Sequence, residues 1–486
     1  MPHHHKSHAI VANTLSAMVA ALELAKKGHE VLLVNPGGPW GGYFAGITSG
    51  GKLFDLGLVT LEFSTFSAQA GHDDLLEYNP TLRNDVGRFF DVVKAWVTPL
   101  VNLTNISTPQ MLVGGKLFDD VLSANAFHAL KQLPFAKSMR DEMVLFSANP
   151  NLHARYKATA RIYNTLDYAT ASIANHGYTF HHKLIAPYLK KVLGINANAM
   201  LARYHRIPWL PLYWPETLKK VLKGDHVDLA PTTFTYPKQS SVAALTQKIA
   251  NLVKQSPLIT SVQSPVSGIK STAAGWLLTL TNALPVTCEH LAWAGSPASL
   301  LLALNEKPQS VIEKKAALAL LFLQIPSTYI CHSVSVLNVV DSQYSIYRVT
   351  NQSVCAESGD AIVQMVVEFN TDYFNATHNI TAAQTDDEIY KLLFQELLEI
   401  GVLNSLEHIS FAEIKRIPNG FLIPDIAVKN ACEHDISILA ERYPDIARMG
   451  MSSGFFVTSF NDQVVQGLQY AALQTQVGQH AYATIS

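Results

Sequence analysis

The sequence predicts an α/β protein with a parallel sheet near its amino terminus and a helical region in its middle. Residues 8–35 read as a strand, a turn, a helix and a second strand, the unit from which parallel sheets are built. Residues 65–233 carry apolar side chains at helical spacing together with frequent aromatic residues. The chain has 486 residues, of which 48% are hydrophobic, enough for a large core and about three domain-sized units.

The amino-terminal unit has two short strands joined by a helix. The apolar run 8–12 forms the first strand, and the β-branched run 30–34 forms the second. Between them, apolar residues of 15–22 recur at helical spacing, and Gly28 follows where a helix ends in a residue of positive φ. A right-handed crossover makes the two strands parallel. The start of the helix then faces the preceding turn, where backbone N–H groups attract a phosphate.

That turn departs from the Gly-x-Gly-x-x-Gly pattern of dinucleotide-binding proteins. The three glycine positions are Ala12, Thr14 and Ala17, and Asn13 lies between the first two. Thr14 either places a β-branched side chain where the backbone must approach the phosphate or turns its hydroxyl towards a phosphate oxygen. Asn35 ends the second strand, where an acidic residue normally binds the ribose, and its amide can still hydrogen-bond a hydroxyl group.

Composition and charge exclude several classes of protein. Charged residues make up 15% of the chain, against about 25% in an average protein, and the net charge of −2 gives no reason to expect nucleic acid. The four cysteines stand far apart with no Cys-x-x-Cys pair, which argues against a disulfide framework and favours a reducing compartment. The apolar run 316–325 is too short to span a membrane, and the first residues lack the apolar stretch of a signal peptide. We therefore expect a cytoplasmic protein.

We expect no metal site. His181 and His182 are adjacent, so their side chains point apart and rarely bind one ion together. The chain also lacks the His-Glu-x-x-His, Gly-x-Ser-x-Gly and phosphate-loop lysine motifs.

Further segments follow the amino-terminal unit in a recognisable order. Gly41-Gly42 precedes Tyr43, and Asp55-Leu56-Gly57 follows. Later segments are 234–253, 259–280, 288–304, 347–353 and 443–472, the last with Gly450-Met451. In this order and spacing the chain resembles the flavin-dependent amine oxidase superfamily, especially its UDP-galactopyranose mutase-like and phytoene desaturase-like branches. Most glycines and the arginine of the family motifs are substituted; Tyr43 stands where the family has arginine.

The resemblance implies a discontinuous Rossmann-like FAD-type domain, a mixed-sheet substrate domain and a helical insert. The FAD-type domain would comprise 1–64, 234–305 and 443–486. The helical substrate-capping region would be 65–233, and 306–442 would supply the strands and helices of the substrate domain.

FAD is the cofactor that the resemblance implies, and two alternatives stay open: the chain binds FAD, or it has lost it. The positions that would contact FAD are Ala12, Asn13, Thr14, Asn35, Gly41, Gly42, Val266, Gly450 and Met451. A nanomolar cofactor is held by about 12 kcal/mol. The missing acid and arginine would together remove about 3–6 kcal/mol of that. Rab GDP-dissociation inhibitors resemble the same fold and use no flavin.

Several residues are candidates for substrate contact. Arg348 is the strongest, because a bidentate guanidinium recognises anions; the alternative is a structural ion pair. His205 and Arg206 are further candidate catalytic residues. Aromatic residues that would wall the substrate pocket are Tyr204, Trp209, Tyr213, Trp214 and Tyr236. The alternative is that these aromatic residues are simply core.

Two functions remain open at this point. The first is a flavin-linked oxidoreductase or isomerase acting on a small, partly apolar organic substrate. The second is a cofactor-free descendant of the flavoprotein fold that binds an apolar ligand or a partner protein. We expect no nucleic-acid partner and no membrane span, and the scarcity of charge favours assembly as a homo-oligomer or as a heteromer with another protein.

Overall fold

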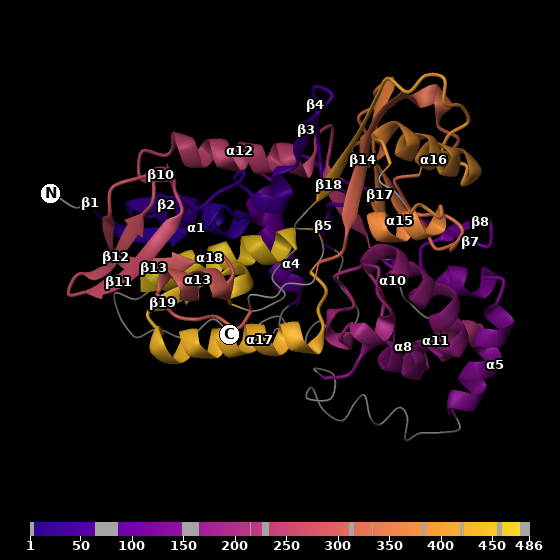
Figure 1. The fold of residues 1–486 in the computed structure, drawn as a ribbon, viewed down its shortest axis with the longest axis horizontal. Coiled ribbons are helices and arrows are strands. Elements are labelled where there is room, and N and C mark those ends of the chain that lie inside the picture. The colour runs from indigo at the N-terminus through magenta and orange to yellow at the C-terminus, as the bar shows by residue number, and fades with distance from the viewer. Residues whose placement is uncertain are drawn as a thin grey trace.

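The computed structural model describes most of the chain as two lobes that lie side by side, each built around its own sheet (Figure 1). The described residues are 4–63, 86–147, 165–213, 215–225, 233–310, 315–332, 334–381, 384–417, 420, 422–453 and 459–476.

The sheet of the first lobe has the strand order β10-β2-β1-β13-β12-β11, and β19 pairs with β13. Its strands are β1 (His4–Val11), β2 (Val31–Asn35), β10 (Ile259–Gln263), β11 (Val266–Thr272), β12 (Gly275–Leu280), β13 (Val286–Trp293) and β19 (Ile446–Arg448). β10, β2, β1, β13 and β19 are parallel, whereas β12 is antiparallel to both of its neighbours, β13 and β11. Three separate parts of the chain thus build one sheet.

Helices cover both faces of this sheet because alternate residues of its central strands point to opposite sides. Ile10 packs with α1 (Leu15–Lys26), α12 (Val242–Gln255) and α18 (Phe460–Gln476). Its neighbours Ala9 and Val11 pack with α13 (Pro297–Ala303) and α17 (Ile426–Arg442). The 426–442 segment, expected in the substrate domain, therefore lies against the first sheet, as Figure 1 shows.

The amino-terminal strand, helix and strand are those that the sequence predicts. β1 and β2 are parallel, and α1 connects them. Gly28 follows the helix with a φ of 87°. Thr14 is the amino-terminal cap of α1.

The second lobe contains a sheet of order β18-β14-β17-β16-β15-β7-β8. Its strands are β7 (Gln110–Val113), β8 (Lys116–Asp119), β14 (Leu318–Pro326), β15 (Val336–Val339), β16 (Ile346–Asn351), β17 (Ile362–Asn370) and β18 (Phe411–Ile417). One face packs against α16 (Asp386–Glu399) and α15 (Thr371–Thr377). The other packs against helices of the middle region.

The middle region is less helical than its apolar spacing predicts. Its helices include α4 (Val86–Val97), α5 (Ala136–Ser147), α8 (Tyr168–His176), α10 (Ala186–Leu193) and α11 (Pro215–Lys223). However, β7 and β8 also come from it and extend the second sheet. The short apolar run 111–113 followed by Gly114 and Gly115 forms a hairpin rather than a helix, because two consecutive residues of positive φ reverse the chain.

Short strands connect the two lobes. β3 (Ile47–Ser49) pairs with β4 (Lys52–Phe54), and β5 (Leu61–Glu62) and β6 (Leu103–Asn105) flank β9 (Phe234–Pro237). In Figure 1, β3, β4 and β5 lie between the two lobes.

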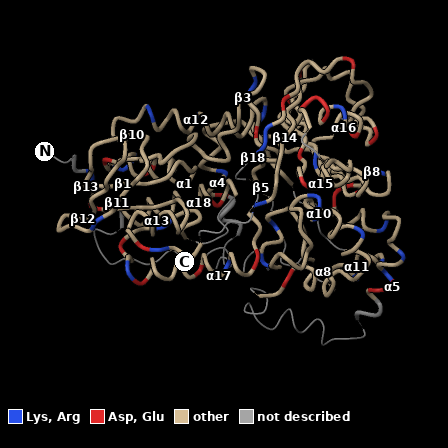
Figure 2. Tube along the Cα trace, in the orientation of Figure 1, with Lys and Arg blue, Asp and Glu red and all other residues tan. Residues whose placement is uncertain are grey.

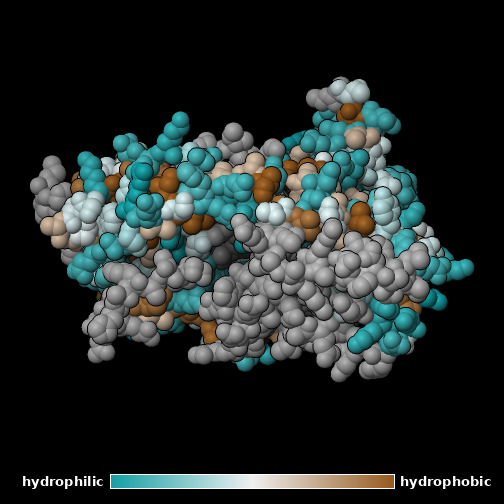
Figure 3. Space-filling view, turned by 90° about the horizontal axis from the view of Figure 1, so that it is seen from below, coloured by the Kyte–Doolittle hydropathy of each residue, from teal (hydrophilic) through white to brown (hydrophobic). Residues whose placement is uncertain are grey.

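Charged and apolar side chains are mixed over the surface of the described residues. Basic and acidic residues are interspersed along the described chain (Figure 2). On the face shown in Figure 3, hydrophilic and hydrophobic side chains of the described residues alternate over short distances. Within the described ranges, no helix is both long enough and apolar enough to cross a membrane.

Candidate functional site

The turn between β1 and α1 is closed by its own side chains. The Thr14 hydroxyl accepts a hydrogen bond from the backbone N–H of Ala17 at 3.4 Å and lies 3.0 Å from the Ser16 hydroxyl. The sequence leaves two alternatives open for Thr14, an obstructing side chain or a hydroxyl that faces a phosphate oxygen; in the structure the hydroxyl instead caps the helix. The hydroxyl therefore serves the helix rather than an external phosphate.

The first two amides of α1 have a partner from the far end of the chain. Oε1 of Gln463, in the first turn of α18, accepts hydrogen bonds from the N–H groups of Leu15 at 3.1 Å and Ser16 at 3.4 Å. In a dinucleotide-binding fold these are groups that face the pyrophosphate. In this chain a glutamine side chain engages them.

Asn35 is also engaged internally. Its Nδ2 donates to the carbonyl oxygen of Gly38 at 3.0 Å, and its Oδ1 accepts from the N–H of Gly37 at 2.8 Å. Both ends of the carboxamide thus hold the loop that follows β2. The amide that the sequence analysis assigns to a ribose hydroxyl fixes its own loop instead.

The two glycines of the next loop differ in their surroundings. The N–H of Gly41 donates to the carbonyl oxygen of Asn13 at 2.6 Å. A Cβ on Gly41 would lie 2.1 Å from Cγ2 of Thr246, so glycine is needed here for packing against α12. A Cβ on Gly42 would meet no atom within 4 Å.

The segment at Gly450, like the start of α1, has a backbone amide that donates to a glutamine side chain. The N–H of Gly450 donates to Oε1 of Gln466 at 2.5 Å, and Nε2 of Gln466 donates to the Ser453 hydroxyl at 2.9 Å. Met451 follows in a short 3-10 turn and is half-buried, as is Val266 at the start of β11.

These contacts test whether the residues present fit FAD. The helix amides, the residue at the ribose position and the Gly450 amide all have internal partners. The arginine position carries Tyr43, whose hydroxyl donates to the carbonyl oxygen of Leu56 at 2.5 Å. FAD bound as the resemblance implies would have to displace these contacts one by one. The residues in this arrangement do not fit the cofactor.

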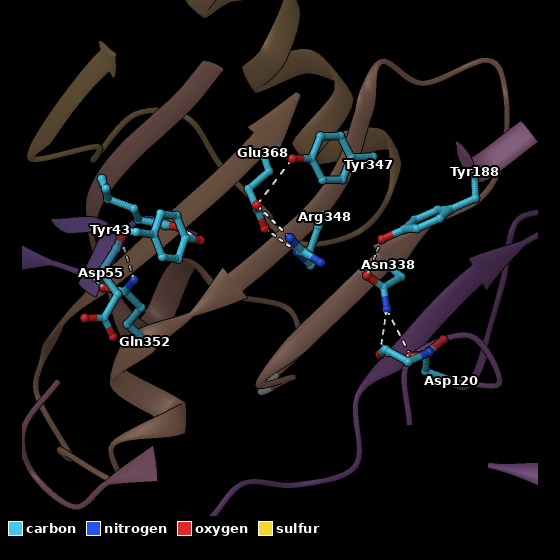
Figure 4. A network of polar contacts seen from close by, with 11 residues as sticks. Tyr43, Asp55, Asp120, Tyr188, Asn338, Tyr347, Arg348, Gln352 and Glu368 are labelled. Carbon is cyan, nitrogen blue, oxygen red and sulfur yellow. Dashed lines mark hydrogen bonds and ion pairs between the residues drawn. The ribbon is translucent and has the colours of Figure 1, made fainter. Parts of the chain in front are cut away.

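Arg348 forms a buried pair with Glu368, which lies directly opposite it on the neighbouring strand. Nε of Arg348 donates to Oε2 of Glu368, and Nη2 donates to Oε1 at 2.7 Å. The Tyr347 hydroxyl donates to the same carboxylate at 3.3 Å. Figure 4 shows the pair in the middle of a line of polar side chains. The guanidinium fork that would recognise an external anion is therefore occupied by an internal carboxylate, and a role in substrate binding stays a prediction.

Asp55 fastens the loop after β4 to the start of α12. Its carboxylate accepts hydrogen bonds from the Tyr236 hydroxyl and from the N–H groups of Ala243 at 2.6 Å and Val242 at 3.3 Å. Burial raises the pKa of Asp55 to about 6, although these hydrogen bonds oppose the shift. Tyr236, a candidate for the pocket wall, is thus fully buried in a structural contact.

His205 and Arg206 lie where the middle region meets the first lobe. Nδ1 of His205 lies 2.7 Å from the carbonyl oxygen of Leu210, so it carries the proton, and burial lowers the pKa of His205 to about 3. Nη2 of Arg206 lies 3.9 Å from Oε2 of Glu62, and its guanidinium lies 5.5 Å from the centre of the Trp209 ring.

Unusual features gather around these two residues. Nε2 of His205 and Nη1 of Arg206 are buried and have no hydrogen-bond partner among the described residues. Trp209 has a φ of 60°, a left-handed conformation that is rare for a bulky residue. Its ring lies edge-on to Phe234, with the ring centres 5.5 Å apart. Unpaired buried polar atoms and backbone strain both concentrate at functional sites.

The described aromatic residues predicted to line the substrate pocket do not lie together. Tyr204, Tyr213 and Tyr236 are each about 1% exposed and belong to three different core clusters. The Tyr213 hydroxyl donates to the carbonyl oxygen of Val121. Trp209 is half-buried beside Arg206, and Trp214 lies outside the described residues.

Sequence reasoning missed Gln463, Gln466, Glu62 and Glu368. Gln463 and Gln466 are three residues apart in a predicted helix, which places them on one face. That spacing was the available signal, but nothing local marks the amides that they contact. As for metals, the described part of the chain holds no group of three His, Cys, Asp or Glu side chains placed to bind an ion.

Comparison with protein-family models and with curated protein sequences finds no match. Among solved structures, reduced UDP-galactopyranose mutase matches with a TM-score of 0.70 and 15% identity, over 98% of this chain and 96% of that chain. A putative protoporphyrinogen oxidase from Exiguobacterium sp. matches at 0.62 and 14%, over 98% and 100%. Cyclohexylamine oxidase from Brevibacterium oxydans matches at 0.60 and 14%, over 99% and 100%. The chain has the fold of these flavin amine oxidase superfamily structures, which confirms the predicted fold.

Proposed function

We propose that this chain is a cofactor-free descendant of the flavoprotein fold that binds a small, partly apolar organic ligand. One observation carries the proposal: the donors that would hold the pyrophosphate are already engaged by Thr14 and Gln463. FAD would have to break these internal hydrogen bonds in order to bind. Its binding free energy would therefore be the gain from the new contacts minus the loss of the internal ones.

The proposed ligand site is the group formed by Glu62, His205, Arg206, Trp209 and Phe234. Nη1 of Arg206 is a donor and Nε2 of His205 is an acceptor, and neither has a partner among the described residues. A ligand that carries both an acceptor and a donor, such as a hydroxyl or carboxamide, would satisfy them. The half-buried Trp209 ring, which packs against Phe234, would supply the apolar contact.

A ligand is favoured over a protein partner by the described surface. Among the described residues, the three most exposed large hydrophobic ones are Leu302 in α13, Leu284 in the turn between β12 and β13, and Tyr178 in the middle region, at 62%, 61% and 59%. Partner-binding surfaces normally gather such residues into one patch.

The proposal is tested by the visible absorption of the purified chain before and after incubation with FAD, followed by dialysis. We expect a colourless protein in both cases. Flavin retained at one equivalent per chain would refute the cofactor-free proposal. A parallel screen would measure the melting temperature with small hydroxyl- or amide-bearing compounds, comparing the wild type with Arg206→Met; a compound that raises it only in the wild type supports the ligand site.

A flavin-linked oxidoreductase or isomerase acting on a small organic substrate is the second candidate. The observation in its favour is Tyr43, which is 44% exposed although it lies beside the buried Arg348–Glu368 pair (Figure 4). An accessible side chain next to a buried ion pair is what a substrate cleft would produce. This candidate requires the flavin retention that the absorption measurement detects.

A further inference from the structure

Each of the first three backbone N–H groups of α1 already donates a hydrogen bond to a side chain of this protein. The first N–H groups of a helix lack partners within the helix and normally bind a cap, water or an anion. In this chain the N–H groups of Leu15 and Ser16 donate to Gln463, and that of Ala17 donates to Thr14. The positive end of the helix dipole is thus covered by neutral oxygen atoms.

Gln466, one turn further along α18, engages the second amide site. It accepts from Gly450 and donates to Ser453, both in the segment that follows β19. Because residues three apart share one helix face, Gln463 and Gln466 both point out of α18 towards the predicted cofactor region. Two side chains of α18 therefore accept hydrogen bonds from the start of α1 and from Gly450, both of which the resemblance places at FAD.

Close packing of α18 on α1 makes this reach possible. A Cβ on Gly467 would lie 2.7 Å from the carbonyl oxygen of Ser16 and 2.9 Å from the backbone nitrogen of Ala20. Only glycine permits this separation of the two helices. The side chain of Gln463, one turn before Gly467, is thereby brought to the first amides of α1.

We propose that Gln463 and Gln466 form an internal plug that replaces the phosphate oxygens of a dinucleotide and keeps a diphosphate site closed. The inference rests on the proposed function, because it explains how a chain of this fold would exclude FAD. A carboxamide oxygen accepts the same hydrogen bonds as a phosphate oxygen but carries no charge. The amides beneath the plug therefore keep the geometry and the dipole that attract a diphosphate.

The test uses the full-length chain and two substitutions at one position. Gln463→Ala removes the acceptor and frees the amides of Leu15 and Ser16. Gln463→Glu keeps an oxygen in place and adds a negative charge that repels a diphosphate. Gln395→Ala, on the exposed surface of α16, is the matched control. Titration calorimetry would measure the binding of ADP and of inorganic pyrophosphate to each variant.

We expect Gln463→Ala to bind ADP at least tenfold more tightly than the wild type, Gln395→Ala or Gln463→Glu. Equal ADP affinity in all four proteins would overturn the plug. If Gln463→Ala does not fold, Gln466→Ala, which frees the Gly450 amide, must show a gain in ADP affinity or the inference fails. Binding of pyrophosphate as well as ADP would show a site that recognises the diphosphate alone. Binding of ADP without pyrophosphate would show a site that also requires the nucleoside.

The two proposals fail in different ways. Flavin retained by the wild type refutes the cofactor-free function. A colourless wild type whose Gln463→Ala variant gains no ADP affinity leaves that function standing and refutes the plug.

Discussion

Oε1 of Gln463 lies 3.1 Å from the backbone nitrogen of Leu15, although 448 positions separate the two residues in the chain. The contact joins the last described helix to the first. It places a neutral acceptor where the fold would present donors to a pyrophosphate.

Gly467→Ala tests the close approach of α18 to α1. Alanine is the better helix former by about 1 kcal/mol. However, its Cβ would lie 2.7 Å from the Ser16 carbonyl oxygen, and neither backbone can yield without moving the helix. We expect a net loss of about 1–2 kcal/mol in the free energy of unfolding, measured by urea denaturation. Gly268→Ala is the control, since its Cβ would meet Thr279 at an ordinary 3.6 Å. A more stable Gly467→Ala protein would contradict the packing.

Thr14→Gly tests whether the Thr14 side chain, rather than Gln463, keeps a phosphate from the start of α1. Glycine removes the hydroxyl that accepts from the Ala17 amide, which lowers the free energy of unfolding by roughly a few tenths of a kcal/mol. Because Gln463 still engages the first two amides, we expect no gain in FAD affinity in an equilibrium titration. The double variant with Gln463→Ala should gain more than Gln463→Ala alone. A gain from Thr14→Gly by itself would mean that Thr14, rather than the glutamine, obstructs the site.

The Arg348–Glu368 pair should behave as a buried structural unit. Arg348→Met leaves a buried carboxylate without its partner, which costs about 3–5 kcal/mol of stability. Arg348→Met combined with Glu368→Leu removes both charges, so we expect the double variant to be more stable than Arg348→Met alone. Urea denaturation of the four proteins in a double-mutant cycle measures the coupling. Strictly additive losses would show that the pair contributes nothing as a pair.

His205 should make the protein less stable in acid. Its pKa is about 3 in the folded chain, below the ordinary value of 6.5, so the folded state excludes a proton that the unfolded state accepts. Its stabilising contribution is complete above pH 6.5 and is lost as the pH falls from there towards 3.

His205→Asn keeps a donor for the Leu210 carbonyl oxygen but cannot titrate. Between pH 7 and pH 5, we expect the unfolding free energy of the wild type to fall by about 2 kcal/mol more than that of the variant. The exposed His434→Asn provides the control. An identical pH dependence in wild type and His205→Asn would show that His205 protonates freely in the folded protein.

The sequence predicts the fold because the fold depends on repeated local patterns. The run 30–34 and the helical spacing of 15–22 become β2 and α1 as expected. Segments 288–304 and 443–472 supply β13, α13, β19 and α18 in the predicted order. The hairpin of β7 and β8 is missed because a short apolar run does not distinguish a strand from part of a buried helix.

The site is less predictable because its decisive contacts join residues that are distant in the sequence. Arg348 stands out as a rare charge, but its partner follows from the register of two strands, which pairs it with Glu368. Tyr236 and Tyr213 stand out as aromatic residues, yet their burial depends on packing from several segments. The left-handed backbone of Trp209 leaves no mark in the sequence around it.

We infer that the chain keeps the flavoprotein fold without its flavin. The most direct measurement is an equilibrium titration of the wild-type chain with FAD, followed by visible absorption after dialysis. We expect that no flavin remains with the wild type and that Gln463→Ala binds ADP at least tenfold more tightly than the wild type does. One equivalent of flavin retained by the wild type would contradict it.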